Sequence, residues 1–506
     1  MNDAQPSFDN SYARLPEAFY SRQSPTPVSR PTLFALNREL AQSLGMNPDW
    51  LSGPEGLAML SGNRLPPGAQ PVAMGYAGHQ FGHWVPRLGD GRALLIGEVV
   101  DRDGVRRDLQ LKGSGPTPYS RRGDGRSSIG PVVREYLASE FMHALGIPTT
   151  RALAAVSTGE QVVRQRMEPG GILCRVASSH VRVGTFEFFA RSGRTEEVRV
   201  LADYVIDRHY PDCRDNCRDN RPDNRHDAGN PYAAMFAAVV RRQARLIADW
   251  LRVGFIHGVM NTDNCSIVGE TIDFGPFGFI DEFNPATVYS SIDHGGRYAY
   301  NQQPAIAQWN LARLAECLLP LFDADPEAAV ELANEHLKTF SSEFEAAFHP
   351  ALAAKIGLSA DPVEHVQLAL DLMDLMSANT ADMTLVFRGL SRLPAAGPEH
   401  DEPVRALFDD PTAFDAWAER WRQRLVAEGR DDAERQAAMQ QVNPAFVLRN
   451  HLAQQAVDAA IERLDFEPMR RLHAVLSKPF EDQPEAADLA LPPAPEERVL
   501  TTFCGT

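Results

Sequence analysis

The sequence predicts an α+β protein with a strand-rich first part and a mostly helical second part. Between residues 80 and 176, short apolar stretches are separated by turn residues, which is typical of strands. From Tyr232 onward, apolar residues recur at helical spacing over longer stretches. Because 506 residues exceed the size at which one core stops growing, we expect two or three structural units.

The first part is expected to place strands before and after one helix. The stretch RALLIGEVV follows a Gly-Asp-Gly turn at residues 89–91, and the stretch DLQLK ends at Lys112. Asp-Gly beside apolar segments favours hairpins. Residues 130–145 are predicted to form a helix, because proline stands in the first turn and glycine and proline follow the end. Further strands are expected at residues 152–166 and 172–176.

The second part is expected to be built from helices. The first, AAMFAAVVRRQARLIADWLRVG, leads the chain directly into His257. Apolar periodicity predicts further helices at residues 305–322, 326–348, 362–379, 411–428, 431–441 and 444–464.

Two segments differ in composition from the rest. Near residues 211–230 the chain repeats Arg-Asp-Asn with little apolar content, which predicts a disordered surface insertion. From residue 478 it is acidic and rich in proline and alanine, which predicts a mobile linker ending in a short docking segment. We therefore divide the chain into an N-terminal extension with a strand-rich lobe, a helical lobe that carries the insertion, and a C-terminal tail, at residues 1–192, 193–477 and 478–506.

Composition limits the classes of protein. A hydrophobic content of 43% and a charged content of 23% are ordinary for a globular protein, and no apolar run reaches the roughly 20 residues of a membrane span. The N-terminus lacks the features of a secretory signal, so we expect a cytoplasmic protein. The net charge of -17 disfavours nucleic-acid binding. Six sparse cysteines indicate reduced thiols, and we expect a monomer.

The most informative stretch is HGVMNTDNCSIVGETIDFGPFGFID, at residues 257–281. It is similar to the metal-binding centre of a protein kinase, in which H-R-D-x-x-x-x-N precedes D-F-G. Asn264 and Asp273 stand where kinases hold magnesium, but Val259 replaces the catalytic aspartate. Asp263 is the nearest carboxylate that could act as a base; its alternative role is a hydrogen bond that caps the loop. The pattern indicates metal-nucleotide binding without the kinase base.

A lysine and a glutamate precede this stretch in the order expected for a kinase. Lys112 ends a predicted strand, and Glu135 lies in the helix that follows. Such a pair would hold the ammonium toward ATP phosphates. Taken alone, each residue is an ordinary exposed charge. Together with the later motif, the order favours a protein kinase-like bilobal fold with a strand-rich small lobe and a mostly helical large lobe.

Several glycines and arginines could bind phosphate. Gly-Asp-Gly-Arg occurs twice, at residues 89–92 and 123–126, and glycines let backbone amides approach an anion while arginine adds donors. The alternative is two tight turns. Arg175 and Arg182 would add positive charge at a nucleotide, or form ion pairs at the surface. They share a face only if the chain between them turns like a helix, because residues seven positions apart on a regular strand point to opposite faces.

Four long motifs in order resemble the selenoprotein O family of kinase-fold protein adenylyltransferases. They are GYAGHQFGHWVPRLGDGRALLIGEV, LQLKGSGPTPYSRRGDGRS, GPVVREYLASEFMHALGIPTT and the stretch at residues 257–281. The resemblance runs from about residue 12 to the C-terminus, apart from the insertion. It implies a bilobal kinase fold that binds ATP in a flipped orientation. It also implies transfer of AMP to Ser, Thr or Tyr hydroxyls of proteins, with release of pyrophosphate.

The resemblance also implies roles for individual residues. Asp263 would be the proton acceptor, and Asn264 and Asp273 would bind Mg²⁺ or Mn²⁺. The nucleotide and its phosphates would be held by Gly89, Gly91, Arg92, Lys112 with Glu135, Asp124, Gly125, Arg175, Arg182 and Asp273. Family members with selenocysteine carry it near the C-terminus, where this chain has Cys504. Some bacterial members also carry a cysteine after the DFG motif that can form a disulfide with a C-terminal cysteine. Residues 273–300 contain no cysteine here, so redox gating by such a disulfide is not expected.

Two other functions remain compatible with the motifs. One is an atypical protein kinase that uses Asp263 as its base. The other is a pseudokinase that binds ATP without catalysis and acts as a scaffold. The sequence leaves open the target proteins and the choice between ATP and UTP.

Overall fold

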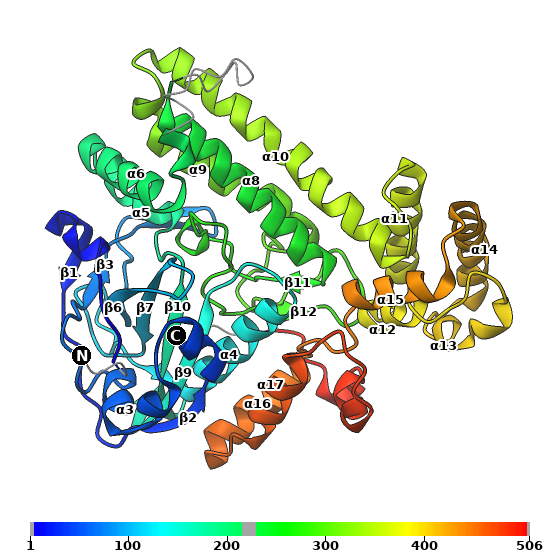
Figure 1. Cartoon of the computed structure of the whole chain (residues 1–506), viewed down its shortest axis with the longest axis horizontal. Helices are drawn as coiled ribbons and strands as arrows, with labels where there is room; N and C mark the ends of the chain where they lie inside the picture. Colours follow the sequence, from blue (N-terminus) through cyan, green and yellow to red (C-terminus); the bar gives the residue numbers. More distant parts are fainter. Residues whose placement is uncertain (1–4, 215–228, 503–506) are drawn as a thin grey trace.

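The computed structural model describes residues 5–214 and 229–502 (Figure 1). One antiparallel sheet of eight strands dominates the first part, in the order β1-β3-β6-β7-β10-β9-β2 with β8 paired to β10. The strands are β1 (Tyr20–Arg22), β2 (Thr32–Leu36), β3 (Val72–Met74), β6 (Ala93–Val100), β7 (Arg106–Lys112), β8 (Ser127–Ser128), β9 (Arg151–Val163) and β10 (Met167–Ala177). The predicted strands correspond to β6, β7, β9 and β10, which form the centre of this sheet.

The sheet has an apolar face and a face that carries polar residues. Leu109 and Leu111 of β7 belong to a buried cluster with residues of three short helices, α1 (Arg38–Ser43), α2 (Pro48–Ser52) and α3 (Pro54–Leu60). Because side chains alternate along a strand, Asp108, Gln110 and Lys112 lie on the opposite face. Helix α4 (Ile129–Ala144), the helix predicted at residues 130–145, packs against β9 and β10.

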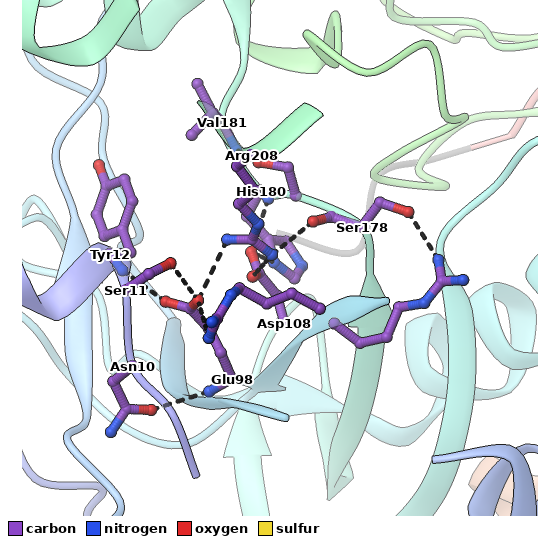
Figure 2. Close-up of polar contacts among 12 residues, drawn as sticks. Asn10, Ser11, Tyr12, Glu98, Asp108, Ser178, His180, Val181 and Arg208 are labelled. Atoms are coloured by element: carbon purple, nitrogen blue, oxygen red, sulfur yellow. Dashed lines mark hydrogen bonds and ion pairs between the residues drawn. The ribbon is translucent and has the colours of Figure 1, made fainter. Parts of the chain in front are cut away.

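Polar contacts continue along this second face toward the N-terminal segment (Figure 2). Asp108 accepts hydrogen bonds from Arg208 at 2.6 Å and from the backbone of His180 at 2.9 Å. The neighbouring Glu98 accepts from the backbone of Tyr12 at 2.6 Å and from the hydroxyl of Ser11 at 2.5 Å. The buried carboxylates of the sheet therefore anchor the segment that precedes it.

The second part is mostly helical. Three long helices run side by side, α8 (Pro231–Arg252), α9 (Gln303–Phe322) and α10 (Pro326–Lys355) (Figure 1). A second buried cluster joins the end of α10 to the helices that follow. The remaining helices are α5 (Val183–Ala190), α6 (Thr195–His209), α11 (Val363–Ala378), α12 (Met383–Leu390), α13 (Glu402–Arg405), α14 (Pro411–Glu428), α15 (Asp432–Val442), α16 (Asn450–Arg463) and α17 (Glu467–Leu476).

The predicted helices of this part correspond to α8, α9, α10, α11, α14, α15 and α16, with two shifted ends. Helix α10 continues through Pro350 to Lys355, because Leu352 and Ile356 are buried in the second cluster. Helix α16 begins at Asn450, later than predicted. The preceding Arg449 forms ion pairs with Asp281 and Asp382, at 2.7 and 2.5 Å. Residues 444–449 therefore pass through the core as an irregular segment and do not form a helix.

The insertion and the tail were expected to be disordered or mobile. Residues 215–228 lie outside the described residues, while residues 212–214 at the edge of the insertion are helical. The tail packs on the protein: the amide of Thr502 donates to the carbonyl of Tyr289 at 2.7 Å, and Leu489 is buried. Cys504 lies outside the described residues. No helix in the described ranges has the length and apolarity to cross a membrane.

Candidate active site

Five charged side chains from five separate segments meet beside the polar face of the sheet. The Lys112 ammonium lies 2.5 Å from Glu135 of α4 and 3.8 Å from Asp273. Arg175 of β10 contacts both Glu135 and Asp273, and Arg182 reaches the other oxygen of Asp273 at 2.8 Å. Three cations therefore face two carboxylates, and this excess of positive charge suits an anionic ligand.

The local structure explains why these residues meet. In the pairing of β10 with β7, Arg175 lies opposite Gln110 and donates a hydrogen bond to it at 3.2 Å. Gln110 and Lys112 are two residues apart and therefore lie on the same face of the sheet. The chain leaves the strand after Ala177, and Arg182 forms an isolated bridge with Ser266 before α5 begins. The chain between the two arginines is an irregular loop and not the helical turn that was expected to bring them together, and this loop places both at one site.

Asp273 is held as a carboxylate by its neighbours. Burial alone would raise its pKa, but Arg175, Arg182 and Lys112 hold the pKa well below the usual range. Its φ of 60° lies in the left-handed region, which is uncommon for a residue with a side chain. Such backbone strain is concentrated at functional sites.

The loop before Asp273 is fixed by His257. Its Nδ1 accepts from the amide of Val259 at 3.3 Å, so Nε2 carries the proton and donates to the carbonyl of Ile272 at 2.9 Å. Burial lowers the pKa of His257, which keeps the ring neutral. Asn264 donates its amide to the carbonyl of Val259 at 2.9 Å. The Oδ1 atom of Asn264 is the side-chain oxygen left for a ligand.

Asp263 is a buried carboxyl with an incomplete set of partners. Its Oδ2 accepts from Gln80 at 3.2 Å, while Oδ1 is buried without a hydrogen bond. Burial raises the pKa of Asp263 to about 7. Its backbone carbonyl accepts from Arg182 at 2.9 Å, which links it to the charged cluster. A carboxyl with a pKa near neutrality is suited to accept a proton at the pH of the cell.

The first Gly-Asp-Gly-Arg turn lies next to the cluster. A Cβ on Gly89 would lie 2.3 Å from the ring of Tyr119, and φ there is +71°, so only glycine fits. The carbonyl of Arg92 accepts from the amide of Gly113, next to Lys112, at 2.6 Å. The positive charge of Arg92 contributes to lowering the pKa of Lys112, after burial and Arg175.

The second Gly-Asp-Gly-Arg turn is closed by local contacts. Asp124 accepts from the amide of Arg126 at 2.9 Å and pairs with Arg164 at 2.9 Å. The carbonyl of Gly125 accepts from Gly115 at 3.0 Å. Arg126 donates to the carbonyl of Thr26 at 3.0 Å, so its guanidinium binds the backbone of another segment of the protein.

A second set of buried groups, to which the sequence analysis assigned no role, fixes the loop that carries Asp263. The amide of His79 donates to Thr262 at 2.7 Å, and the Thr262 hydroxyl donates to Glu187. His79 Nδ1 lies 2.6 Å from Glu187, whose pKa burial raises to about 7. These contacts join β4 (Gly78–Gln80), which pairs with β5 (His83–Val85), to α5 and to the loop. The GYAGHQFGHW motif, which is rich in glycine, histidine and aromatic residues, was the sequence feature that could have indicated these contacts.

Comparisons with known proteins identify the family to which the chain belongs. The family model described as protein adenylyltransferase SelO matches residues 4–477. A relative named protein nucleotidyltransferase YdiU from Rhodopseudomonas palustris (strain BisB5) is 58% identical over 499 residues, which cover 99% of each chain. One of the same name from Alkalilimnicola ehrlichii is 60% identical over 499 residues, covering 99% of this chain and 98% of the relative. The chain therefore belongs to the SelO family of protein adenylyltransferases.

Proposed function

We propose that the enzyme transfers AMP from ATP to Ser, Thr or Tyr hydroxyls of cytoplasmic proteins, releases pyrophosphate and acts as a monomer. The observation that carries this proposal is the cluster of Lys112, Arg175 and Arg182 around Asp273. It concentrates positive charge where a polyphosphate would lie. Val259 occupies the position of the kinase base, which agrees with chemistry at another phosphate.

We further propose a kinase-like bilobal organisation. The sheet with α4 would form the small lobe, and the helices from α8 onward would form the large lobe. The buried pair of Lys112 and Glu135, at 2.5 Å, supports this assignment, because kinases place this pair between a strand and a packed helix. The proposed lobes are residues 1–192 and 193–477, followed by the tail.

The nucleotide is proposed to lie between the glycine turns and the cluster. Gly89, Gly91 and Arg92 of the first turn and Asp124 and Gly125 of the second turn would line it. Lys112, Arg175 and Arg182 would bind its phosphates, because a guanidinium offers paired donors to phosphate oxygens. Glu135 would orient Lys112 and Arg175 through the contacts already present.

The residues present also fit Mg²⁺ or Mn²⁺. Asn264 Oδ1 and the Asp273 carboxylate would hold the ion, and when bound it would neutralise phosphate charge. Within residues 5–214 and 229–502, no three His, Cys, Asp or Glu side chains converge as a metal site. Two oxygen ligands from the protein agree with magnesium, which takes few protein ligands and shares the rest with phosphates and water.

Asp263 is proposed to accept the proton of the substrate hydroxyl. The hydroxyl oxygen would form a bond to the α-phosphorus, the bond to the β-phosphate oxygen would break, and pyrophosphate would leave with the electron pair. The proton would go to Asp263, whose Oδ1 has no partner in the described structure. A pKa of about 7 allows this carboxyl to take up a proton and release it afterwards.

ATP labelled in separate reactions at the α- or γ-phosphate tests the proposal. The purified enzyme is incubated with Mg²⁺ and casein as acceptor, and intact mass identifies the adduct. We expect the α-label in protein and an AMP adduct, both absent in Asp273→Ala. Transfer of the γ-label alone would establish an atypical kinase. Thermal stabilisation by ATP without any adduct would establish a pseudokinase scaffold.

A further inference from the structure

A cavity of about 390 Å³ lies at the C-terminal end of α4, away from the nucleotide cluster. Its wall includes residues 144–146, Arg252 at the end of α8, Lys355 at the end of α10 and Gln441 of α15. Ala351 and Phe480 supply an apolar side. Glu135 lies nine residues before Ala144 on α4, a separation of about 14 Å along a helix. An occupant of the cavity would therefore not overlap the proposed nucleotide.

Lys355 is a buried cation without an anionic partner. It is 3% exposed, and its Nζ lies 4.2 Å from the centre of the Phe387 ring. Among the described residues, no carboxylate forms an ion pair with it. Burial, and then the positive charge of Arg252, lower the pKa of Lys355 to about 7. Burying an ammonium without a counter-ion is costly, so a bound anion would stabilise its charged form.

The other charged groups near the cavity already have partners within the protein. Arg252 donates to Asp249 at 2.8 Å and to the carbonyl of Leu145 at 3.1 Å, which fixes its guanidinium at the wall and leaves other N–H groups. In the tail, Asp482 is held by Arg388 at 2.7 Å. This carboxylate, two residues after Phe480, is therefore not the counter-ion of Lys355.

We propose that the cavity binds a small organic carboxylate. Its carboxylate group lies between Lys355 and Arg252, and its apolar body packs against Ala351 and Phe480. The mixed wall favours this class over inorganic phosphate, because phosphate carries more charge than one lysine and one partly engaged arginine neutralise and has no apolar body. Gln441 supplies a further polar contact. This site is independent of the proposed transfer reaction.

Calorimetric titration of the full chain with 2-naphthoate, its neutral amide and inorganic phosphate tests the proposal. We expect saturable binding of naphthoate with a dissociation constant below about 1 mM, no binding of the amide, and weaker binding of phosphate. The Lys355→Met variant is expected to lose about tenfold or more in affinity. The Lys338→Met variant, which changes an exposed lysine of the same helix, is expected to bind as the wild type does.

Two further measurements keep the test decisive. Gln441→Glu places a rival carboxylate at the exposed rim and is expected to weaken naphthoate binding even if Lys355→Met does not fold. Saturating ATP is expected to leave naphthoate binding unchanged. The proposal is overturned if the wild type shows no saturable binding of naphthoate, binds the amide equally well or binds phosphate more strongly. It is also overturned if ATP competes with naphthoate. Unchanged naphthoate affinity in folded Lys355→Met or in Gln441→Glu would overturn it as well.

Discussion

Arg182 Nη1 lies 2.8 Å from Oδ2 of Asp273 and thereby joins the start of α5 to the proposed metal ligand. The same nitrogen lies 2.9 Å from the carbonyl oxygen of Asp263. One guanidinium therefore sets the distance between the proposed proton acceptor and the proposed metal ligand. Its plane also lies near the Tyr76 ring, at 4.5 Å from the ring centre. A lysine at this position could not make all of these contacts.

We expect Arg182→Lys to lower kcat for AMP transfer by about 100-fold, because the ammonium keeps the charge but loses the fork of donors. Kinetics with α-labelled ATP would measure the change. Arg191→Lys is the matched control, because Arg191 pairs with Glu316 at the surface, with 47% of its side chain exposed. Equal activity of Arg182→Lys and the wild type would show that the Arg182 guanidinium does not contribute to AMP transfer.

The pH dependence of transfer is expected to follow Asp263. Only the carboxylate form accepts a proton, and burial raises its pKa to about 7. Activity should therefore rise as the pH increases through about 7 and level off above it. Asp263→Asn should lower kcat by roughly 10²–10⁴-fold and flatten the profile. If Asp263→Asn retained the wild-type rise near pH 7, another group would be the base.

Glycine at position 125 is expected to be required for folding of the second Gly-Asp-Gly-Arg turn. A Cβ on Gly125 would lie 2.2 Å from the backbone of Gly115, and φ is +64°. Gly125→Ala should lower the free energy of unfolding by about 3 kcal/mol or more. Gly104→Ala is the control, because φ is +78° but no atom lies within 4 Å. It should cost only about 1 kcal/mol. Chemical denaturation would compare the two, and equal losses would contradict the steric argument.

Lys355 is expected to make stability depend on pH. Its pKa is lowered from 10.5 to about 7 in the folded chain, so between these values the unfolded chain binds more protons. The free energy of unfolding contributed by this residue should therefore rise from pH 7 to pH 10, by roughly 3–5 kcal/mol. Lys355→Met, which removes the buried charge, should lack this rise and be more stable than the wild type at pH 7. Parallel pH dependence of both proteins in urea denaturation would show that Lys355 is not buried as an uncompensated charge.

The sequence predicted the main elements well where a local pattern was strong. Strands β6, β7, β9 and β10 and helices α4 and α8 follow from apolar spacing and turn residues, which act within a few positions of the chain. Helices α1, α2, α3, α5, α6, α12, α13 and α17 were not predicted. The late start of α16 was also missed, because it depends on the pairing of Arg449 with Asp281 and Asp382, which are distant in the sequence.

By itself, the sequence determined the chemical inventory and its order: Lys112, Glu135, Asn264 and Asp273, with Val259 where a kinase has its base. The tertiary structure alone decided that Arg175 and Arg182 share Asp273 and that Asp263 is buried beside Gln80. It also decided that Lys355 has no carboxylate partner among the described residues. The physical reason is that burial and charge pairing depend on segments brought together by folding, whereas motifs and periodicity report only neighbours along the chain.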